Sequence, residues 1–429
     1  MNATTLKNAI NSGEFKSAFT YLYNQKGGDM PSRYIDAVDE FVNLFGDSDE
    51  LRVFSAPGRT EVGGNHTDHQ HGCVICAGIN LDIIAIAKKN DDNIIRVKSA
   101  GYPMDEIDLS VLTPQESENE HASALIRGVA ARFKELGYAI GGFDAYTTSN
   151  VLKGSGLSSS AAFEVMICTL LNGLYNDGKM DAVEAAIVSQ YAENVFFNKP
   201  CGLMDQVACS VSGFVGIDFN DTANPVIEKV DFDFAKVNHS LCIVDTGGSH
   251  SDLTNEYAAV PQEMNAVASF FGKEYLRQVD ETEFYKNIPA LREKVNDRAI
   301  LRAIHFFADN KRAVTLKDLL KEGDFDGFLK TVKESGRSSL AYLQNVYAAS
   351  APQEQGLTLA LAITERILGD RGGYRVHGGG FAGTIQAYVP NDMLDTYKSE
   401  MEKVFGENHC YVLSVRPVGG VEVDANLGK

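Results

Sequence analysis

The stretch that decides the fold is Lys153-Gly154-Ser155-Gly156-Leu157-Ser158-Ser159-Ser160-Ala161-Ala162, a glycine- and serine-rich loop that runs into an apolar segment. Residues 161–175 are apolar on nearly every side, which predicts a buried helix. A loop that opens a helix presents unpaired backbone N–H groups and the positive end of the helix dipole to a bound anion. The consecutive serines add hydroxyl donors and one candidate ligand for Mg²⁺. This stretch therefore predicts a phosphate-binding loop.

Two known phosphate-binding patterns do not describe this loop. A P-loop needs Gly-x-x-x-x-Gly-Lys-Ser/Thr, and a dinucleotide fold needs Gly-x-Gly-x-x-Gly after a strand. Neither pattern is present. The alternative without a ligand is a buried helix that is capped by serine and preceded by a flexible lead-in.

Two more motifs flank the loop at a distance along the chain. Upstream lies Ala56-Pro57-Gly58-Arg59, followed by Gly63-Gly64-Asn65-His66-Thr67-Asp68-His69. A strand that ends in a glycine turn can aim Arg, His and Asp side chains into one pocket. Downstream lies Gly378-Gly379-Gly380-Phe381-Ala382-Gly383, directly before a strand. Such a cluster lets the backbone approach another backbone or a ligand closely, although a plain glycine turn would look the same.

The pattern of apolar residues divides the chain into three parts. Within residues 1–50 the apolar side chains recur at helical intervals, which predicts a helical extension. Val- and Ile-rich runs at 51–56, 79–88 and 94–99 predict strands, and further strands are expected at 142–148, 240–245, 383–389 and 409–417. Helices are expected at 121–136, 161–175, 181–197 and 255–271, the third stopping ahead of Pro200. We expect an N-terminal domain at 51–235 and a C-terminal domain at 236–429.

Composition limits the classes of function. A chain of 429 residues, 44% hydrophobic and 23% charged, fits two domains of a well-packed enzyme. The net charge of −19 argues against nucleic acid as a partner, because phosphate backbones need Lys and Arg surfaces. The absence of an 18-residue apolar run predicts no membrane span. Seven scattered cysteines, an odd number, predict a reduced, cytoplasmic protein.

Together, the three motifs resemble the signature motifs of the GHMP kinases, and the chain looks like a galactokinase-type member of that family. The segment Pro200-Cys201-Gly202-Leu203-Met204-Asp205-Gln206 resembles the one that carries the family's catalytic aspartate. Glu193, twelve positions before Asp205, matches the family's metal-binding glutamate. The resemblance runs from about Phe54 to the C-terminus. It implies an α+β fold of two domains with the active site in the cleft between them.

The resemblance also implies roles for named residues in an ATP-dependent sugar kinase. Asp205 would accept the proton of the sugar hydroxyl or orient that hydroxyl, and Arg59 would stabilise developing charge beside it. Ser160 and Glu193 would hold Mg²⁺, which prefers hard oxygen ligands. Ser99 is a further candidate nucleotide contact. The residues expected to wrap the ATP phosphates are Gly154, Ser155, Gly156, Leu157, Ser158, Ser159 and Ser160.

The sugar site departs from the family pattern. Family members read Gly-Glu-His-x-Asp-Tyr, and here Asn65 replaces the glutamate that accepts a sugar hydroxyl, while His69 replaces the tyrosine. Glu61 stands where the family usually has asparagine, so a compensating exchange is conceivable. The residues expected to bind sugar are Asn65, His66, Asp68, Gly202 and Tyr257. Galactose is the first choice of substrate, to be phosphorylated on its anomeric hydroxyl, and an N-acetylated galactose is the alternative.

Two rival readings remain at the level of sequence. His66, Asp68, His69, His71, Cys73 and Cys76 crowd together and could form a metal site. A sugar sensor without catalysis, built on the same fold, would fit Asn65. The sequence sets no oligomeric state and assigns no role to residues 1–50.

Overall fold

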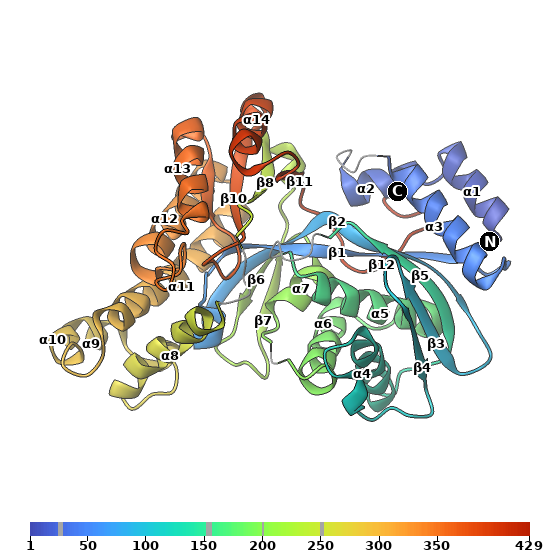
Figure 1. Cartoon of the computed structure of the whole chain (residues 1–429), viewed down its shortest axis with the longest axis horizontal. Helices are drawn as coiled ribbons and strands as arrows, with labels where there is room; N and C mark the ends of the chain where they lie inside the picture. Colours follow the sequence, from blue (N-terminus) through green and yellow to red (C-terminus); the bar gives the residue numbers. More distant parts are fainter. Residues whose placement is uncertain (25–28, 152–156, 200, 249–252) are drawn as a thin grey trace.

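The computed structural model describes residues 1–24, 29–151, 157–199, 201–248 and 253–429. Within these ranges, long strands join two lobes (Figure 1). The larger sheet has the order β12-β1-β2-β5-β3-β4, with β6 paired to β2 and β7 paired to β6. Its strands are β1 (Arg52–Gly63), β2 (Cys73–Lys89), β3 (Ile94–Ser99), β4 (Met104–Asp108), β5 (Phe143–Ser149), β6 (Phe214–Asp218), β7 (Val226–Val230) and β12 (Val421–Glu422).

Side chains alternate between the two faces of this sheet, and each face has its own helices. Val53, Ile84 and Ile86 pack in one cluster with the N-terminal helices, whereas Phe54 and Ile83 pack in another with the central helices. Figure 1 shows the two helical layers on opposite sides of the sheet. The first layer is α1 (Ala3–Ser12), α2 (Lys16–Tyr23) and α3 (Met30–Phe45); the second is α4 (Ala122–Glu135), α5 (Ser159–Asn176), α6 (Ala182–Tyr191) and α7 (Met204–Val211).

The second lobe is built on a smaller antiparallel sheet in the order β11-β8-β10-β9. These strands are β8 (His239–Asp245), β9 (Gly373–Val376), β10 (Thr384–Pro390) and β11 (Cys410–Leu413). Its helices are α8 (Thr254–Phe270), α9 (Glu281–Lys286), α10 (Ile288–Leu291), α11 (Asp297–Glu322), α12 (Phe325–Ser338), α13 (Gly356–Leu368) and α14 (Leu394–Phe405). The mixture of helices with largely antiparallel sheets agrees with the expected α+β class.

A buried carboxylate ties the N-terminal helices to the sheet. Asp82, on β2, accepts hydrogen bonds from Arg33 at 2.5 Å, from Tyr23 at 2.6 Å and from Arg416 at 3.2 Å, and also from Ser55. Burial would raise the pKa of Asp82, but the two arginines lower it below its ordinary value. Arg33 is on α3 and Arg416 lies near the C-terminus, so one charge joins three distant parts of the chain.

The C-terminal segment does not stay in the second lobe. Strand β12 pairs with β1, and Val423 is buried in the cluster of the N-terminal helices. The expected domain of residues 236–429 therefore sends its last residues back to the first sheet. The boundary at 235 and 236 falls between β7 and β8 and stays a prediction.

Two helices end in a wider, π-helical turn. Helix α6 continues into such a turn at Ala192–Phe196, and α12 continues into one at Ser339–Leu343. The first contains Glu193 and lies within the range 181–197, over which the sequence predicted an ordinary helix. Wider turns of this kind are frequent at functional sites. No helix in the described part of the chain is long and apolar enough to cross a membrane.

Candidate active site

The centre of the candidate site is an ion pair between the first motif and the start of α7. The Arg59 guanidinium binds both carboxylate oxygens of Asp205, with Nε to Oδ1 at 2.7 Å and NH2 to Oδ2 at 2.9 Å. Arg59 is 7% exposed, whereas the Asp205 side chain is 32% exposed. The pair therefore presents one carboxylate to solvent and holds it from behind by a buried cation.

The charge of Asp205 is well stabilised. Burial would raise its pKa, but the charge and hydrogen bonds of Arg59, with a hydrogen bond from the Ser158 hydroxyl, lower it below its ordinary value. Asp205 also lies in the first turn of α7, where the helix dipole favours an anion. Asp205 is thus ionised at neutral pH.

The described part of the glycine- and serine-rich loop touches the first motif directly. The backbone N–H of Arg59 donates to the Leu157 carbonyl at 3.2 Å. A Cβ at Gly58 would lie 3.0 Å from that same carbonyl oxygen and 3.0 Å from Val151, so a larger residue would push against the loop. Ser158, in a left-handed conformation with φ of 53°, begins α5. Gly154, Ser155 and Gly156 lie outside the described residues.

A second acidic centre lies behind Asp205. Glu193 is 3% exposed and Glu164, on α5, is completely buried. The Gln206 side-chain amide donates to both, at 2.8 Å to Glu193 and 3.1 Å to Glu164. Burial and the Glu193 carboxylate raise the pKa of Glu164 well above its ordinary value. Motifs in the sequence indicate a role for Glu193 but none for Glu164 or Gln206, although Glu164 follows Ser160 by one helical turn.

Three of the expected sugar-binding residues lie beside other motifs. A Cβ at Gly202 would lie 3.2 Å from Asp68 Oδ2, so these two residues face each other. No group among the described residues donates to the Asp68 carboxylate, which leaves it available to a ligand. His66, with φ of 57°, donates from Nε2 to the Gly379 carbonyl at 2.9 Å. The first motif thereby contacts the third.

Tyr257 lies against the third motif. Its hydroxyl donates to the Gly380 carbonyl at 2.7 Å, and its ring packs edge-on against Phe381 with centroids 5.1 Å apart. A Cβ at Gly379 would come within 2.6 Å of this ring. Burial raises the pKa of Tyr257 to about 12. Gly379 therefore makes room for the Tyr257 ring.

Asn65 is placed differently from the expectation that it binds sugar. It is completely buried, and its side-chain amide donates to Glu61 at 3.0 Å and to the Gly378 carbonyl at 2.9 Å. Its oxygen accepts from Ser339 at 3.1 Å and from Asn345 at 2.8 Å. These four contacts use the full hydrogen-bonding capacity of the amide, so in this structure Asn65 has nothing left for a sugar hydroxyl.

Glu61 is the partner that makes this arrangement possible. Its Oε1 accepts from Asn65 and, at 2.8 Å, from the buried Arg375 on β9. Two of the positions at which the sequence departs from the family pattern, Glu61 and Asn65, therefore touch each other. Their contact joins the end of β1 to the second lobe.

The remaining candidates are less central. Ser99, at the end of β3, accepts a hydrogen bond from Thr147 on β5 at 2.9 Å. Strand β5 leads toward the phosphate loop, so Ser99 lies near the expected nucleotide side without a contact that defines its role.

The rival metal site is not assembled. Among the described residues, no three His, Cys, Asp or Glu side chains gather to hold a metal ion by themselves. Cys73 and Cys76 are buried in β2, and burial raises the pKa of each thiol. They are packing residues of the sheet.

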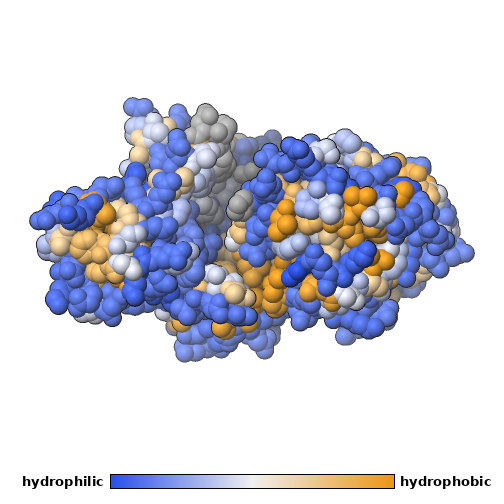
Figure 2. Space-filling model, turned by 90° about the horizontal axis from the view of Figure 1, so that it is seen from below, coloured by the Kyte–Doolittle hydropathy of each residue, from blue (hydrophilic) through white to orange (hydrophobic). Residues whose placement is uncertain are grey.

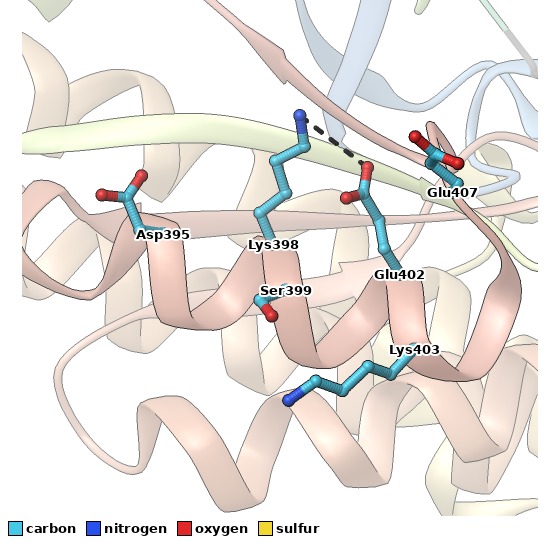
Figure 3. Close-up of a pocket in the computed structure, with 6 residues that line it drawn as sticks. All are labelled: Asp395, Lys398, Ser399, Glu402, Lys403 and Glu407. Carbon is cyan, nitrogen blue, oxygen red and sulfur yellow. Dashed lines mark ion pairs between the residues drawn. The ribbon is translucent and has the colours of Figure 1, made fainter.

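The surface of α14 carries a hollow that is unrelated to these motifs. Figure 3 shows its lining, in which acidic and basic side chains alternate and Lys398 faces Glu402 at 3.8 Å. The hollow measures about 390 Å³ and is open to solvent. None of the motif residues lines this hollow. Seen from below, the surface of the molecule is largely hydrophilic, with apolar areas on both lobes (Figure 2).

Comparison with known proteins gives a consistent answer. Residues 124–213 match the family described as "GHMP kinases N terminal domain", and residues 39–89 match the "Galactokinase galactose-binding signature". The chain is 30% identical over 369 residues to the galactokinase of Streptomyces coelicolor, with 86% of this chain and 92% of that protein covered.

Solved structures share the fold. Lactococcus lactis galactokinase complexed with galactose superposes with a TM-score of 0.74 at 22% identity, covering 89% of this chain and 98% of that one. Methanococcus jannaschii mevalonate kinase gives a TM-score of 0.58 at 15% identity, with 86% and 99% covered. At these identities the likeness shows the fold alone.

Proposed function

The chain belongs to the galactokinase family of GHMP kinases, and we propose that it transfers the γ-phosphoryl group of ATP to the anomeric hydroxyl of galactose. The observation that carries this proposal is the two-pronged ion pair of Arg59 and Asp205, which stands where the first motif meets the start of α5 and of α7. A carboxylate held in this way is positioned, charged and partly exposed to a ligand.

The chemistry assigned to this pair follows from its charge. The sugar oxygen attacks the γ-phosphorus as the bond to the ADP oxygen breaks, and the hydroxyl proton passes to Asp205 and from there to solvent. Because the pKa of Asp205 is lowered, the carboxylate is a weak base, so its main contribution is to orient and polarise the hydroxyl. Phosphoryl transfer depends chiefly on positioning and charge stabilisation, which suits such a group.

The nucleotide side is proposed from the second motif. Residues 154–160, together with Ser99, would contact ATP. Ser160 and Glu193 would hold Mg²⁺, which neutralises charge on the phosphates when bound. The local chemistry fits a cation, because Glu193 lies with Glu164 in a buried acidic centre whose nearest counter-ion is Lys199 at 3.7 Å.

The sugar side is proposed from His66, Asp68, Gly202 and Tyr257. Asp68 and Gly202 face each other, and His66 and Tyr257 meet at the third motif. Asn65 would act through these neighbours, because its own amide is saturated. The related candidate substrate is N-acetylgalactosamine, since the family's sugar-contacting glutamate is absent at position 65.

The test measures ADP release by the purified chain with ATP, Mg²⁺ and one sugar at a time. We expect turnover with galactose, loss of at least about a hundredfold in Asp205→Ala, and normal turnover in the control Asp221→Ala, which changes an exposed loop residue. Phosphorus NMR of the product would locate the new phosphate on the anomeric oxygen.

The other outcomes separate the alternatives. Faster turnover with N-acetylgalactosamine would keep the kinase and change its substrate. Binding of galactose without ADP release for any sugar would contradict the proposed activity and favour the sensor.

A further inference from the structure

The acidic centre behind Asp205 contains buried acceptor atoms that have no donor. Glu164 Oε1 and Gln206 Oε1 are both buried without a hydrogen-bond partner, and neither residue is exposed to solvent. Leaving a buried polar atom unpaired costs about 1–3 kcal/mol, and more when it is charged. Two such acceptor atoms in one cluster leave a place for a donor or for a cation.

Among the residues that the structure describes, no Lys or Arg side chain fills this role. Lys199 is the cation recorded against Glu193, at 3.7 Å, and its side chain is 64% exposed. Arg59 is occupied by Asp205. Within the described residues, the two buried carboxylates therefore share one amide donor, Gln206 Nε2, and have no close cation of their own.

Helix geometry places a hydroxyl on the same side of this centre. Ser160 and Glu164 are four residues apart on α5, so their side chains lie on one face of the helix, one turn apart. Glu193 approaches from the π-helical turn that follows α6. A hydroxyl and two carboxylates thus converge from two elements, and hard oxygen ligands of this kind select divalent cations such as Mg²⁺ or Mn²⁺.

We propose that Glu164 is a direct ligand of the divalent cation and completes the set formed by Ser160 and Glu193. This inference rests on the proposed kinase function, from which the cation comes. It adds a carboxylate to the metal site and assigns Gln206 to positioning, because its side-chain amide donates to both carboxylates.

The experiment titrates Mn²⁺ into the protein in the presence of a non-hydrolysable ATP analogue and follows free Mn²⁺ by electron paramagnetic resonance. Glu164→Gln keeps the shape of the side chain and removes its charge. We expect it to weaken Mn²⁺ binding at least tenfold, while the control Glu322→Gln, an exposed residue at the end of α11, leaves the affinity unchanged. Glu164→Asp should retain part of the affinity.

The competing explanation is a proton shared by the two carboxylates, and it predicts a different result. In that case Glu164→Gln leaves the Mn²⁺ affinity at the wild-type value, which would overturn the inference. If Glu164→Gln fails to fold, the Glu164→Asp variant still decides, since loss of affinity with a shortened carboxylate supports ligation and an unchanged affinity contradicts it.

Failure of the inference and failure of the proposed function can be told apart. An unchanged Mn²⁺ affinity alongside galactose-dependent ADP release removes Glu164 from the metal site and leaves the kinase in place. Weakened Mn²⁺ binding in a chain that phosphorylates no sugar would leave the ligand assignment standing and contradict the activity.

Discussion

At the scale of single residues, the contact between Glu61 and Asn65 explains two departures from the family pattern at once. In this structure Arg375 pairs with Glu61 at 2.8 Å. With asparagine at 61 and glutamate at 65, as in the family pattern, the carboxylate would lie on the residue next to position 61 in this cluster and not directly on Arg375. Exchange of the two side chains keeps one carboxylate and one amide in the cluster. The sequence suggested such an exchange, and only the structure shows that the two side chains touch.

We expect the single variants Glu61→Asn and Asn65→Glu to be damaging and the double variant to recover. Glu61→Asn leaves the buried Arg375 without its partner, and Asn65→Glu adds a second buried carboxylate, so each should cost about 3–5 kcal/mol. The double variant again has one carboxylate and one amide in the cluster. The two substitutions should therefore show a favourable coupling energy of at least about 1 kcal/mol. Urea denaturation of the four proteins measures this. Strictly additive losses would contradict the direct contact.

Two titratable groups of the site, Asp205 and His69, should make no contribution to the shape of the pH profile between pH 5 and 8. Asp205 has a lowered pKa and is ionised well below pH 5. Burial lowers the pKa of His69 to about 4, so this ring is neutral above that value. Neither group changes its charge between pH 5 and 8, so neither should make kcat/KM rise or fall with pH in this range. A rise or fall in that range that disappears in His69→Gln would contradict this assignment.

The roles of residues that stand in a sequence motif could be predicted. The roles of residues that depend on contacts in the folded structure could not. Arg59, Asp205 and Ser158 stand in recognisable segments, and the structure brings them into contact. Asn65 stands in such a segment too, yet four internal hydrogen bonds occupy it. Glu164 lies within a helix whose apolar character concealed it, because burial and an unpaired oxygen cannot be seen in sequence.

At the scale of elements, periodicity located several helices and strands, some to within about two residues and others with different ends. Strand β3 matches its expected range of 94–99, and α4, α5 and α8 agree within about two residues, the usual uncertainty of helix ends. Strand β1 runs on through the glycines to Gly63 with two register shifts, where the pattern indicated a turn. Strand β12 spans two residues and exists only because β1 offers it an edge.

The N-terminal helices should depend on the buried charge of Asp82. Asp82→Asn leaves Arg33 and Arg416 with an uncharged partner inside the protein, and we expect a loss of about 3–5 kcal/mol in the free energy of unfolding. Urea denaturation measures the loss, with the exposed Asp39→Asn on α3 as the matched control. A loss below about 1 kcal/mol would show that the network contributes little.

The same carboxylate sets an acid limit. The pKa of Asp82 is lower in the folded protein than in the unfolded chain. Its contribution to the free energy of unfolding is therefore complete at a pH above the unfolded pKa and is lost as the pH falls through the folded pKa. Wild-type stability should therefore fall below about pH 4, and Asp82→Asn should lose this part of the pH dependence.

At the scale of the whole molecule, the C-terminal segment holds the first lobe together. Val423 is 2% exposed among the N-terminal helices, and Glu422 pairs with Arg52. Deleting residues 421–429 should lower the free energy of unfolding by at least about 2 kcal/mol, since burial of one valine alone is worth about 1.5–3 kcal/mol. Thermal unfolding measures it, and deletion of Lys429 alone is the control. An unchanged melting temperature would show that the returning segment is dispensable.

The length of β1 and β2 has a mechanical consequence. These paired strands, on the order of 40 and 55 Å long, extend from the N-terminal helices to α11, and side chains of β1 are bonded to the second lobe through Glu61 and Asn65. The two lobes are therefore joined by a continuous pair of strands, and any change in their relative position must twist or bend this pair. Two ligands that each deform this pair of strands are coupled through it, and linkage then requires each to change the affinity for the other by the same factor.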